Sequence, residues 1–187
     1  MFNNKLIILI GRSGSGKSTI ESELIKHGFK KIISHTSREI RDDDLIGESY
    51  HFVDKEFFEN EINCDIELQV VDRKNIEKRI LFYWSKMYNM SIKEGEDYVA
   101  VVNPNGFRSL TKLFPNNISF YIKVNEKTML LRALNREECP NCKIICQRFL
   151  SDEIEFSNIE NEVDYVIFNN DNINETVNKI LKNIKDF

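Results

Sequence analysis

The chain has 187 residues, 41% of them hydrophobic, and its 26 Lys and Arg stand against 30 Asp and Glu for a formal net charge of −4. The length fits one domain with a proper core, and the acidic balance argues against a dedicated nucleic-acid-binding surface. No apolar run is long enough to cross a membrane, and the first residues lack the order of a secretory signal. We therefore expect a cytoplasmic protein with no nucleic-acid or membrane partner.

Apolar runs typical of buried strands recur along the chain, with stretches of helical spacing between them. The expected strands are Leu6–Ile10, Lys31–Ser34, Tyr98–Asn103, Ser119–Val124 and Tyr165–Phe168. The expected helices are Ser18–Lys26, Thr128–Leu134, Cys146–Ile159 and Ile173–Ile184. This alternation predicts an α/β fold with a central parallel sheet covered by helices on both faces.

The first expected strand leads directly into the segment Gly11–Ser18, which fits the phosphate-binding pattern G-x-x-x-x-G-K-[ST] with no mismatch. Small residues let successive backbone N–H groups point at one anion, and the following helix adds its own N-terminal donors. The motif predicts a P-loop NTPase fold in which Lys17 binds the β- and γ-phosphates of ATP and the hydroxyl of Ser18 ligates Mg²⁺. The expected ATP-binding residues of the loop are Gly11, Ser13, Gly14, Ser15, Gly16, Lys17, Ser18 and Thr19.

Two segments interrupt the alternation of strands and helices. A charged, turn-rich stretch from Ser37 to Gln69, with an extended piece at 50–53, predicts a small inserted subdomain on the ligand side of the sheet. A second segment, Asn135–Ile145, predicts a lid. The expected division is a core of 1–36, 98–134 and 146–187, a substrate-binding insertion and following helix at 37–97, and a lid at 135–145.

The insertion carries Arg38 and Arg41, whose planar guanidinium groups suit a phosphate monoester, although such arginines could also pair with neighbouring acidic residues in a solvated loop. The ordered set resembles the GMP-binding insertion of the guanylate kinases, and the resemblance covers nearly the whole chain; its residues are Ser34, Thr36, Ser37, Arg38, Arg41, Gly47, Tyr50 and Phe52. The resemblance implies an ATP-dependent nucleoside monophosphate kinase with GMP, and also dGMP, as acceptor.

The resemblance also implies an acceptor site. Its expected ligands of the GMP phosphate are Ser34, Arg38, Arg41, Tyr50 and Tyr83. Ser85 would bind the guanine carbonyl and Glu67 the guanine N1–H and amino protons, with Gln69 and Glu77 as alternatives to Glu67. Asn103 stands where the family has an aspartate that helps to read the amino group. An amide both donates and accepts, so this change should weaken the selection for guanine.

Further arginines match the family near the lid. The segments Leu131–Arg136 and Gln147–Phe149 resemble those whose arginines close over the transferring phosphoryl group, which implies catalytic roles for Arg136 and Arg148 beside Lys17 and Arg41. Phosphoryl transfer depends mainly on such charge neutralisation. The segment 164–171 resembles the family's D-Y-x-I-x-N-D motif and implies that Asn169 helps to position adenine.

Three questions stay open in the sequence. Cys139, Cys142 and Cys146 suggest half of a Zn²⁺ site, but no fourth ligand is near in sequence, so we expect free thiols. A ribose 1,5-bisphosphate kinase on the same scaffold would suit Asn103, and a silent protein-binding module would not need the intact Lys17 and Ser18. The chain could be a monomer or a homodimer.

Overall fold

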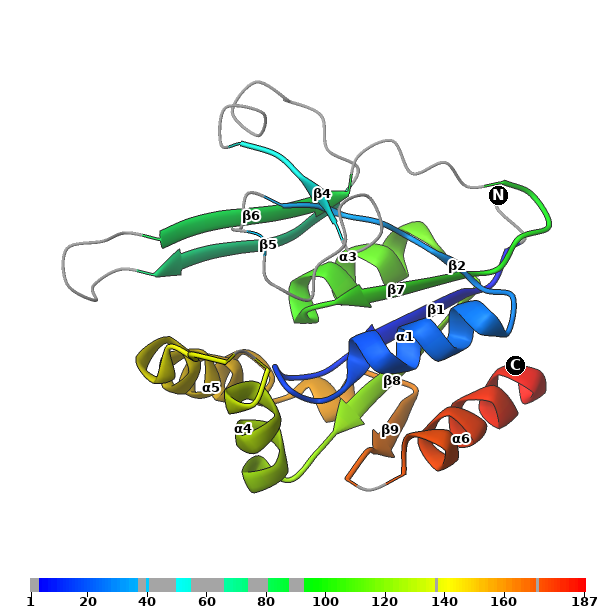
Figure 1. Cartoon of the computed structure of the whole chain (residues 1–187). Coiled ribbons are helices and arrows are strands. Elements are labelled where there is room, and N and C mark those ends of the chain that lie inside the picture. The colour runs from blue at the N-terminus through cyan, green and yellow to red at the C-terminus, as the bar shows by residue number, and fades with distance from the viewer. Residues whose placement is uncertain are drawn as a thin grey trace.

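The computed structural model describes residues 4–36, 40, 50–54, 66–73, 81–87, 93–136, 138–170 and 172–187. Within these residues, five strands form a parallel sheet in the order β2-β7-β1-β8-β9 (Figure 1). Its strands are β1 (Leu6–Ile10), β2 (Lys30–Lys31), β7 (Tyr98–Val102), β8 (Asn117–Lys123) and β9 (Tyr165–Phe168). The predicted parallel sheet is confirmed.

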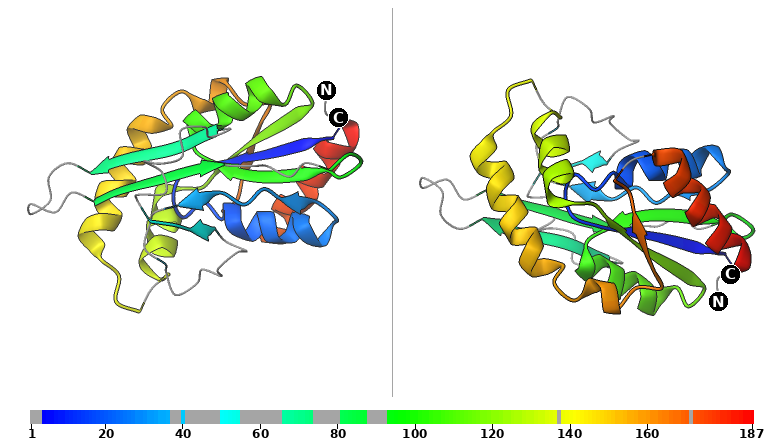
Figure 2. Two further views of the ribbon diagram at one scale, coloured as in Figure 1. Left: turned by 90° about the horizontal axis from the view of Figure 1, so that it is seen from above. Right: turned by 90° about the horizontal axis from the view of Figure 1, so that it is seen from below.

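The central strand β1 is buried along its whole length, as expected for a parallel strand with helices on both sides. Ile7 and Leu9 face one side of the sheet, which is covered by α1 (Lys17–Lys26) and α6 (Ile173–Asp186). Ile20 of α1 and Ile180 of α6 are fully buried in this layer. Figure 2 shows these two helices side by side on one face.

The other face of the sheet is covered by α3 (Pro104–Leu113) and by the segment that follows α5 (Cys142–Glu155), which includes the short 3₁₀ helix η1 (Ile159–Asn161). Phe107 and Leu110 of α3 and Phe156 pack against the residues of β1 that face this side, which are Leu6, Ile8 and Ile10. The sheet therefore has one helical layer on each face, as predicted. A further helix, α4 (Glu126–Leu134), leads from β8 toward α5 (Figure 1).

A second, smaller sheet has the order β4-β3-β6-β5 and lies beside α3 (Figure 1). Its strands are β3 (His35–Thr36), β4 (His51–Phe52), β5 (Ile66–Arg73) and β6 (Leu81–Met87). β5 pairs with β6 in antiparallel fashion, with an irregularity between Glu67 and Gln69. An irregularity of this kind interrupts the regular two-residue alternation of a strand.

The expected strand Lys31–Ser34 is wrong in its bounds. Only Lys30 and Lys31 pair in the large sheet, and the chain then crosses to the small sheet, which it enters at His35. The backbone N–H of Ile32 still donates to Val99 O at 3.0 Å. The segment therefore pairs first in the large sheet and then in the small one. This is why the expected single strand is divided into two short strands.

Helix α5 begins four residues before its expected start and ends before its expected end. Asn141 caps it, with the side-chain oxygen accepting from Ile144 N at 3.2 Å. The chain leaves the helix at Phe156, and η1 is a separate turn. Because residues 142–145 belong to α5, the connection between α4 and α5 is shorter than the predicted lid at 135–145.

Candidate active site

The phosphate loop connects β1 to α1 and needs glycine at two of its positions. Gly14 and Gly16 have φ angles of 81° and 90°, in the left-handed region that favours glycine. A Cβ at Gly14 would lie 2.5 Å from the carbonyl oxygen of Met129, and one at Gly16 would lie 2.5 Å from Nδ2 of Asn169. The sequence pattern of the loop therefore follows from backbone conformation and from the closeness of its neighbours.

Asn169 supports the loop from the end of β9. It is 3% exposed, its Nδ2 donates to Ser15 O at 2.9 Å, and its Oδ1 accepts from Thr176 Oγ1 at 3.1 Å. Arg132 of α4 donates from Nη1 to Asn169 O at 3.1 Å. The contacts of Asn169 are thus with the protein itself, and its implied role toward adenine stays a prediction.

The amine of Lys17 lies against the loop backbone, where Nζ donates to Gly11 O at 2.6 Å and to Arg12 O at 3.0 Å. The pKa of Lys17 is lowered to about 8, mainly by burial; the negative charge of Asp152 opposes this shift, and the positive charges of Arg148 and Arg136 contribute to it. Arg136 of the predicted lid and Arg148 of α5 therefore lie close enough to Lys17 to affect its pKa.

Helix α5 is attached to the phosphate loop by contacts that the sequence analysis missed. Asp152 accepts from Ser13 N at 2.7 Å through Oδ2. One turn earlier, Phe149 O accepts from Nη2 of Arg12 at 2.9 Å, and the Arg12 guanidinium lies 4.5 Å from the centre of the Phe149 ring. These contacts set the position of Arg148 relative to the loop.

A pocket extends from the phosphate loop toward the start of the small sheet. Its lining comes from the phosphate loop, from two residues of the predicted GMP-binding motif, from the end of β7 and from α5 with the residue after it. The lining residues are Gly11, Ser13, Lys17, Ser34, Tyr50, Val101, Val102, Asn103, Arg148, Asp152, Glu155 and Phe156. Four predicted site residues outside the loop, namely Ser34, Tyr50, Asn103 and Arg148, thus share one pocket with Lys17.

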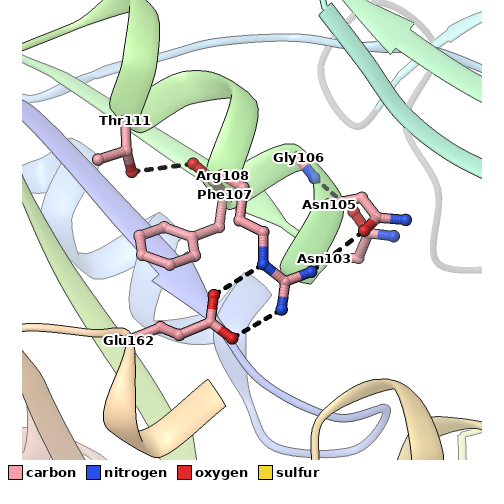
Figure 3. A network of polar contacts seen from close by, with 7 residues as sticks. All are labelled: Asn103, Asn105, Gly106, Phe107, Arg108, Thr111 and Glu162. Atoms are coloured by element: carbon pink, nitrogen blue, oxygen red, sulfur yellow. Dashed lines mark hydrogen bonds and ion pairs between the residues drawn. The ribbon is translucent and has the colours of Figure 1, made fainter. Parts of the chain in front are cut away.

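Asn103 caps helix α3 inside this pocket. Its Oδ1 accepts from Gly106 N at 2.9 Å, as Figure 3 shows, and its Nδ2 donates to Glu155 Oε1 at 2.7 Å. Burial raises the pKa of Glu155, against the effect of this hydrogen bond. Farther along α3, Arg108 forms an exposed pair of hydrogen bonds with Glu162, each 2.7 Å long (Figure 3).

Comparison with known proteins decides the family. The family model described as guanylate kinase matches residues 3–187. The chain belongs to the guanylate kinase family. The guanylate kinase of Rickettsia prowazekii is 31% identical over 194 residues, with 96% of this chain and 90% of the relative covered. That of Prochlorococcus marinus is 28% identical over 195 residues, with 97% of each covered.

A solved structure agrees with the fold. The crystal structure of guanylate kinase from Anaplasma phagocytophilum superimposes with a TM-score of 0.68 at 19% identity, covering 98% of this chain and 85% of that one. Membership of the guanylate kinase family assigns this chain to the kinases, the ATP-dependent phosphotransferases. The resemblance drawn from the sequence motifs is therefore confirmed.

The described residues include only part of the acceptor site that the guanylate kinase resemblance implies. Arg38, Arg41 and Glu77 lie outside the described residues. Glu67, Tyr83 and Ser85 are placed by backbone register alone, which pairs Glu67 with Lys86, Gln69 with Ser85 and Val71 with Tyr83 across β5 and β6. Their implied contacts with GMP stay predictions.

Cys139, Cys142 and Cys146, in the predicted lid and just after it, are exposed free thiols. In the described part of the chain, no three His, Cys, Asp or Glu side chains are grouped so as to hold a metal ion. The same residues include no helix with the length and apolar character needed to span a membrane.

The sequence analysis overlooked Asp152 and Glu155, which lie on the side of α5 that also carries Arg148 into the pocket. A helix brings residues four and seven positions apart onto one face. A signal for both carboxylates was therefore present, because they follow Arg148 at those two spacings.

Proposed function

We propose that this chain transfers the γ-phosphoryl group of ATP to GMP, and also to dGMP, in the reaction MgATP + GMP ⇌ MgADP + GDP. The observation that carries the proposal is the single pocket lined by Lys17 of the phosphate loop and by Ser34 and Tyr50 of the predicted acceptor motif. A donor site and an acceptor site that share one pocket are what direct transfer between two phosphates requires.

In the proposed step an ionised oxygen of the acceptor phosphate attacks the γ-phosphorus in line. The bond from that phosphorus to the β–γ bridging oxygen breaks, and ADP leaves with the electron pair. No general base is needed, because the attacking oxygen carries no proton at neutral pH. In the proposal, Lys17, Arg148 and Arg136 neutralise charge on the transferring group, and the effect of both arginines on the pKa of Lys17 supports these roles.

The guanylate kinase motif also implies a site for Mg²⁺. Ser18 is exposed at the first turn of α1, and its hydroxyl is the hard oxygen donor that this ion prefers. We propose Ser18 as its protein ligand, and the bound ion would supply further charge neutralisation to the β- and γ-phosphates.

The acceptor side of the proposal includes Arg38, Arg41, Tyr83, Ser85 and Glu67 beside Ser34 and Tyr50, and Asn169 near adenine. We keep the division into a core, an insertion at 37–97 and a lid, with the lid ending where α5 begins at Cys142. A cytoplasmic location is part of the proposal, because both substrates are nucleotides.

The test is a coupled assay of ADP release with ATP and, in turn, GMP, dGMP, AMP, UMP, CMP and ribose 1,5-bisphosphate. We expect GMP to give the highest kcat/KM and dGMP the next. Lys17→Ala should abolish every rate, whereas Lys123→Ala, which removes a surface ion pair with Glu160, should leave them unchanged. ADP release that does not depend on an acceptor, or a preference for ribose 1,5-bisphosphate, would contradict the proposal.

A further inference from the structure

A carboxylate of the protein itself lies on the phosphate loop. Asp152 is 7% exposed, and its Oδ2 accepts from Ser13 N at 2.7 Å. The backbone N–H groups of such a loop are turned toward the anion of a ligand. Here one of them already contacts an internal anion, which the phosphate-binding motif does not require.

The same carboxylate stands among the cations of the pocket. Of the charges that act on Lys17, that of Asp152 has the largest effect, ahead of Arg148 and Arg136 from the lid side and Glu21 from α1. Asp152 therefore cancels part of the positive potential that three cations provide for phosphate. Any phosphate that enters beside Lys17 also enters the field of a fixed negative charge.

Asp152 cannot leave this position without a wider change. Its helix is attached to Arg12 of the loop one turn earlier, through the 2.9 Å hydrogen bond to Phe149 O and the contact with the Phe149 ring. The carboxylate also lines the pocket, together with Lys17 and the acceptor residues Ser34 and Tyr50. In the proposed reaction the γ-phosphoryl group passes through this same pocket.

We propose that Asp152 determines how the loop discriminates between nucleoside triphosphate and diphosphate, by weakening the binding of the triphosphate. Repulsion between charges falls with distance, so the γ-phosphate, at the acceptor side of the loop, meets more of it than the α- and β-phosphates do. The inference rests on the proposed binding of ATP at this loop.

The test removes the negative charge of residue 152 and keeps its hydrogen bond with Ser13 N. Asp152→Asn retains an oxygen that accepts from Ser13 N but carries no charge. Dissociation constants are measured by isothermal titration calorimetry for ADP and for the non-hydrolysable β,γ-imido analogue of ATP, at one fixed Mg²⁺ concentration. We expect the triphosphate analogue to bind about tenfold more tightly to the variant and ADP to change by less than about threefold.

The control is Asp164→Asn, since Asp164 Oδ2 likewise accepts a backbone hydrogen bond, from Ser119 N at 2.8 Å, but lies outside the pocket. It should alter neither dissociation constant. Equal changes for both nucleotides in Asp152→Asn, or weaker binding of both, would show a structural role and overturn the proposal. Asp152→Ser, with a smaller neutral acceptor, repeats the measurement if the first variant does not fold. A wild-type protein that binds neither nucleotide would instead refute the proposed function.

Discussion

Asn103 donates its side-chain amide to Glu155 at 2.7 Å, which ties the first turn of α3 to the last turn of α5. Both groups of the amide are used, because Oδ1 caps α3. An aspartate at this position could still cap the helix, but it would place a second carboxylate beside Glu155. The asparagine is therefore matched to its neighbour on α5, independently of any role toward the acceptor base.

The burial of Glu155 predicts a pH-dependent contribution to stability. Its pKa is raised in the folded protein, so the folded state holds the proton of Glu155 more tightly than the unfolded state does. The stability that this proton contributes is fully present below the unfolded pKa of 4.5 and is lost as the pH rises through the raised pKa of the folded state. Glu155→Gln, which does not ionise, should therefore gain stability relative to the wild type as the pH increases from 4 to 8. The measurement is the free energy of unfolding in urea at several pH values.

Glu162 offers the matched control, since the hydrogen bond from Arg108 lowers its pKa. Its contribution is present above the ordinary value and is lost as the pH falls through the lowered one. Glu162→Gln should therefore lose stability relative to the wild type as the pH rises through the lowered pKa to 4.5, which is the opposite trend, and its pH series extends below 4. A Glu155→Gln variant whose difference from the wild type does not vary with pH would contradict the raised pKa.

The loop glycines predict a sharp contrast among alanine variants. Gly14→Ala should raise the Kd for ATP about tenfold or more, because the new Cβ would lie 2.5 Å from a backbone oxygen as well as adopt a left-handed φ. Gly28 also has a positive φ, of 99°, but has nothing within 4 Å of a new Cβ. Gly28→Ala should lose about 1 kcal/mol of stability and keep the Kd. Equal losses of ATP affinity in both variants would contradict this account.

The hydrogen bond from Asn169 to the phosphate loop predicts that loss of this side chain destabilises the loop. Asn169→Ala leaves Ser15 O without its donor, and we expect a decrease of about 1 to 3 kcal/mol in the free energy of unfolding together with a higher KM for ATP. Asn183→Ala, which removes an exposed amide bonded to Lys179 O, should change neither quantity. A variant of Asn169 with normal stability but a higher KM would instead favour a direct contact with adenine.

Because Arg148 adds positive charge beside Lys17, we expect its removal to slow the chemical step. Arg148→Ala should lower kcat about a hundredfold or more, as expected for the loss of a group that stabilises developing charge on the phosphoryl group. Arg108→Ala breaks an exposed ion pair with Glu162 and an exposed hydrogen bond to Asn105, and should leave kcat within about twofold. Steady-state kinetics with ATP and GMP measure both, and an unchanged kcat in Arg148→Ala would remove this arginine from the proposed mechanism.

Those parts of the fold that depend on local sequence pattern were predictable. The bounds of β1 and β9 match the expected strands, and those of α1 differ by one residue, because each element is a periodic apolar segment bordered by polar or small residues. Helix α3 was not expected. Its first residues, Pro104 to Gly106, are typical of a turn, yet proline is favourable at the first helical position and Asn103 supplies the cap.

The site residues that belong to short, contiguous sequence motifs were predictable. Lys17, Ser34, Tyr50, Asn103 and Arg148 share the pocket, and each was found from a short motif. The contact of Asp152 with Ser13 spans 139 positions of the chain, and its recognition requires knowing that α5 packs on the loop. Contacts between elements distant in sequence depend on topology, which a motif does not contain.

The chain crosses from the large sheet to the small sheet at residues 32–34. Ile32 is held to β7 of the large sheet, whereas Ser34 O accepts from His51 N in the small sheet. The phosphate loop is attached to the first sheet through β1, whereas Ser34, which lines the same pocket, is attached to the second. A short backbone link between the two sheets therefore limits how far apart the proposed donor and acceptor sites can lie.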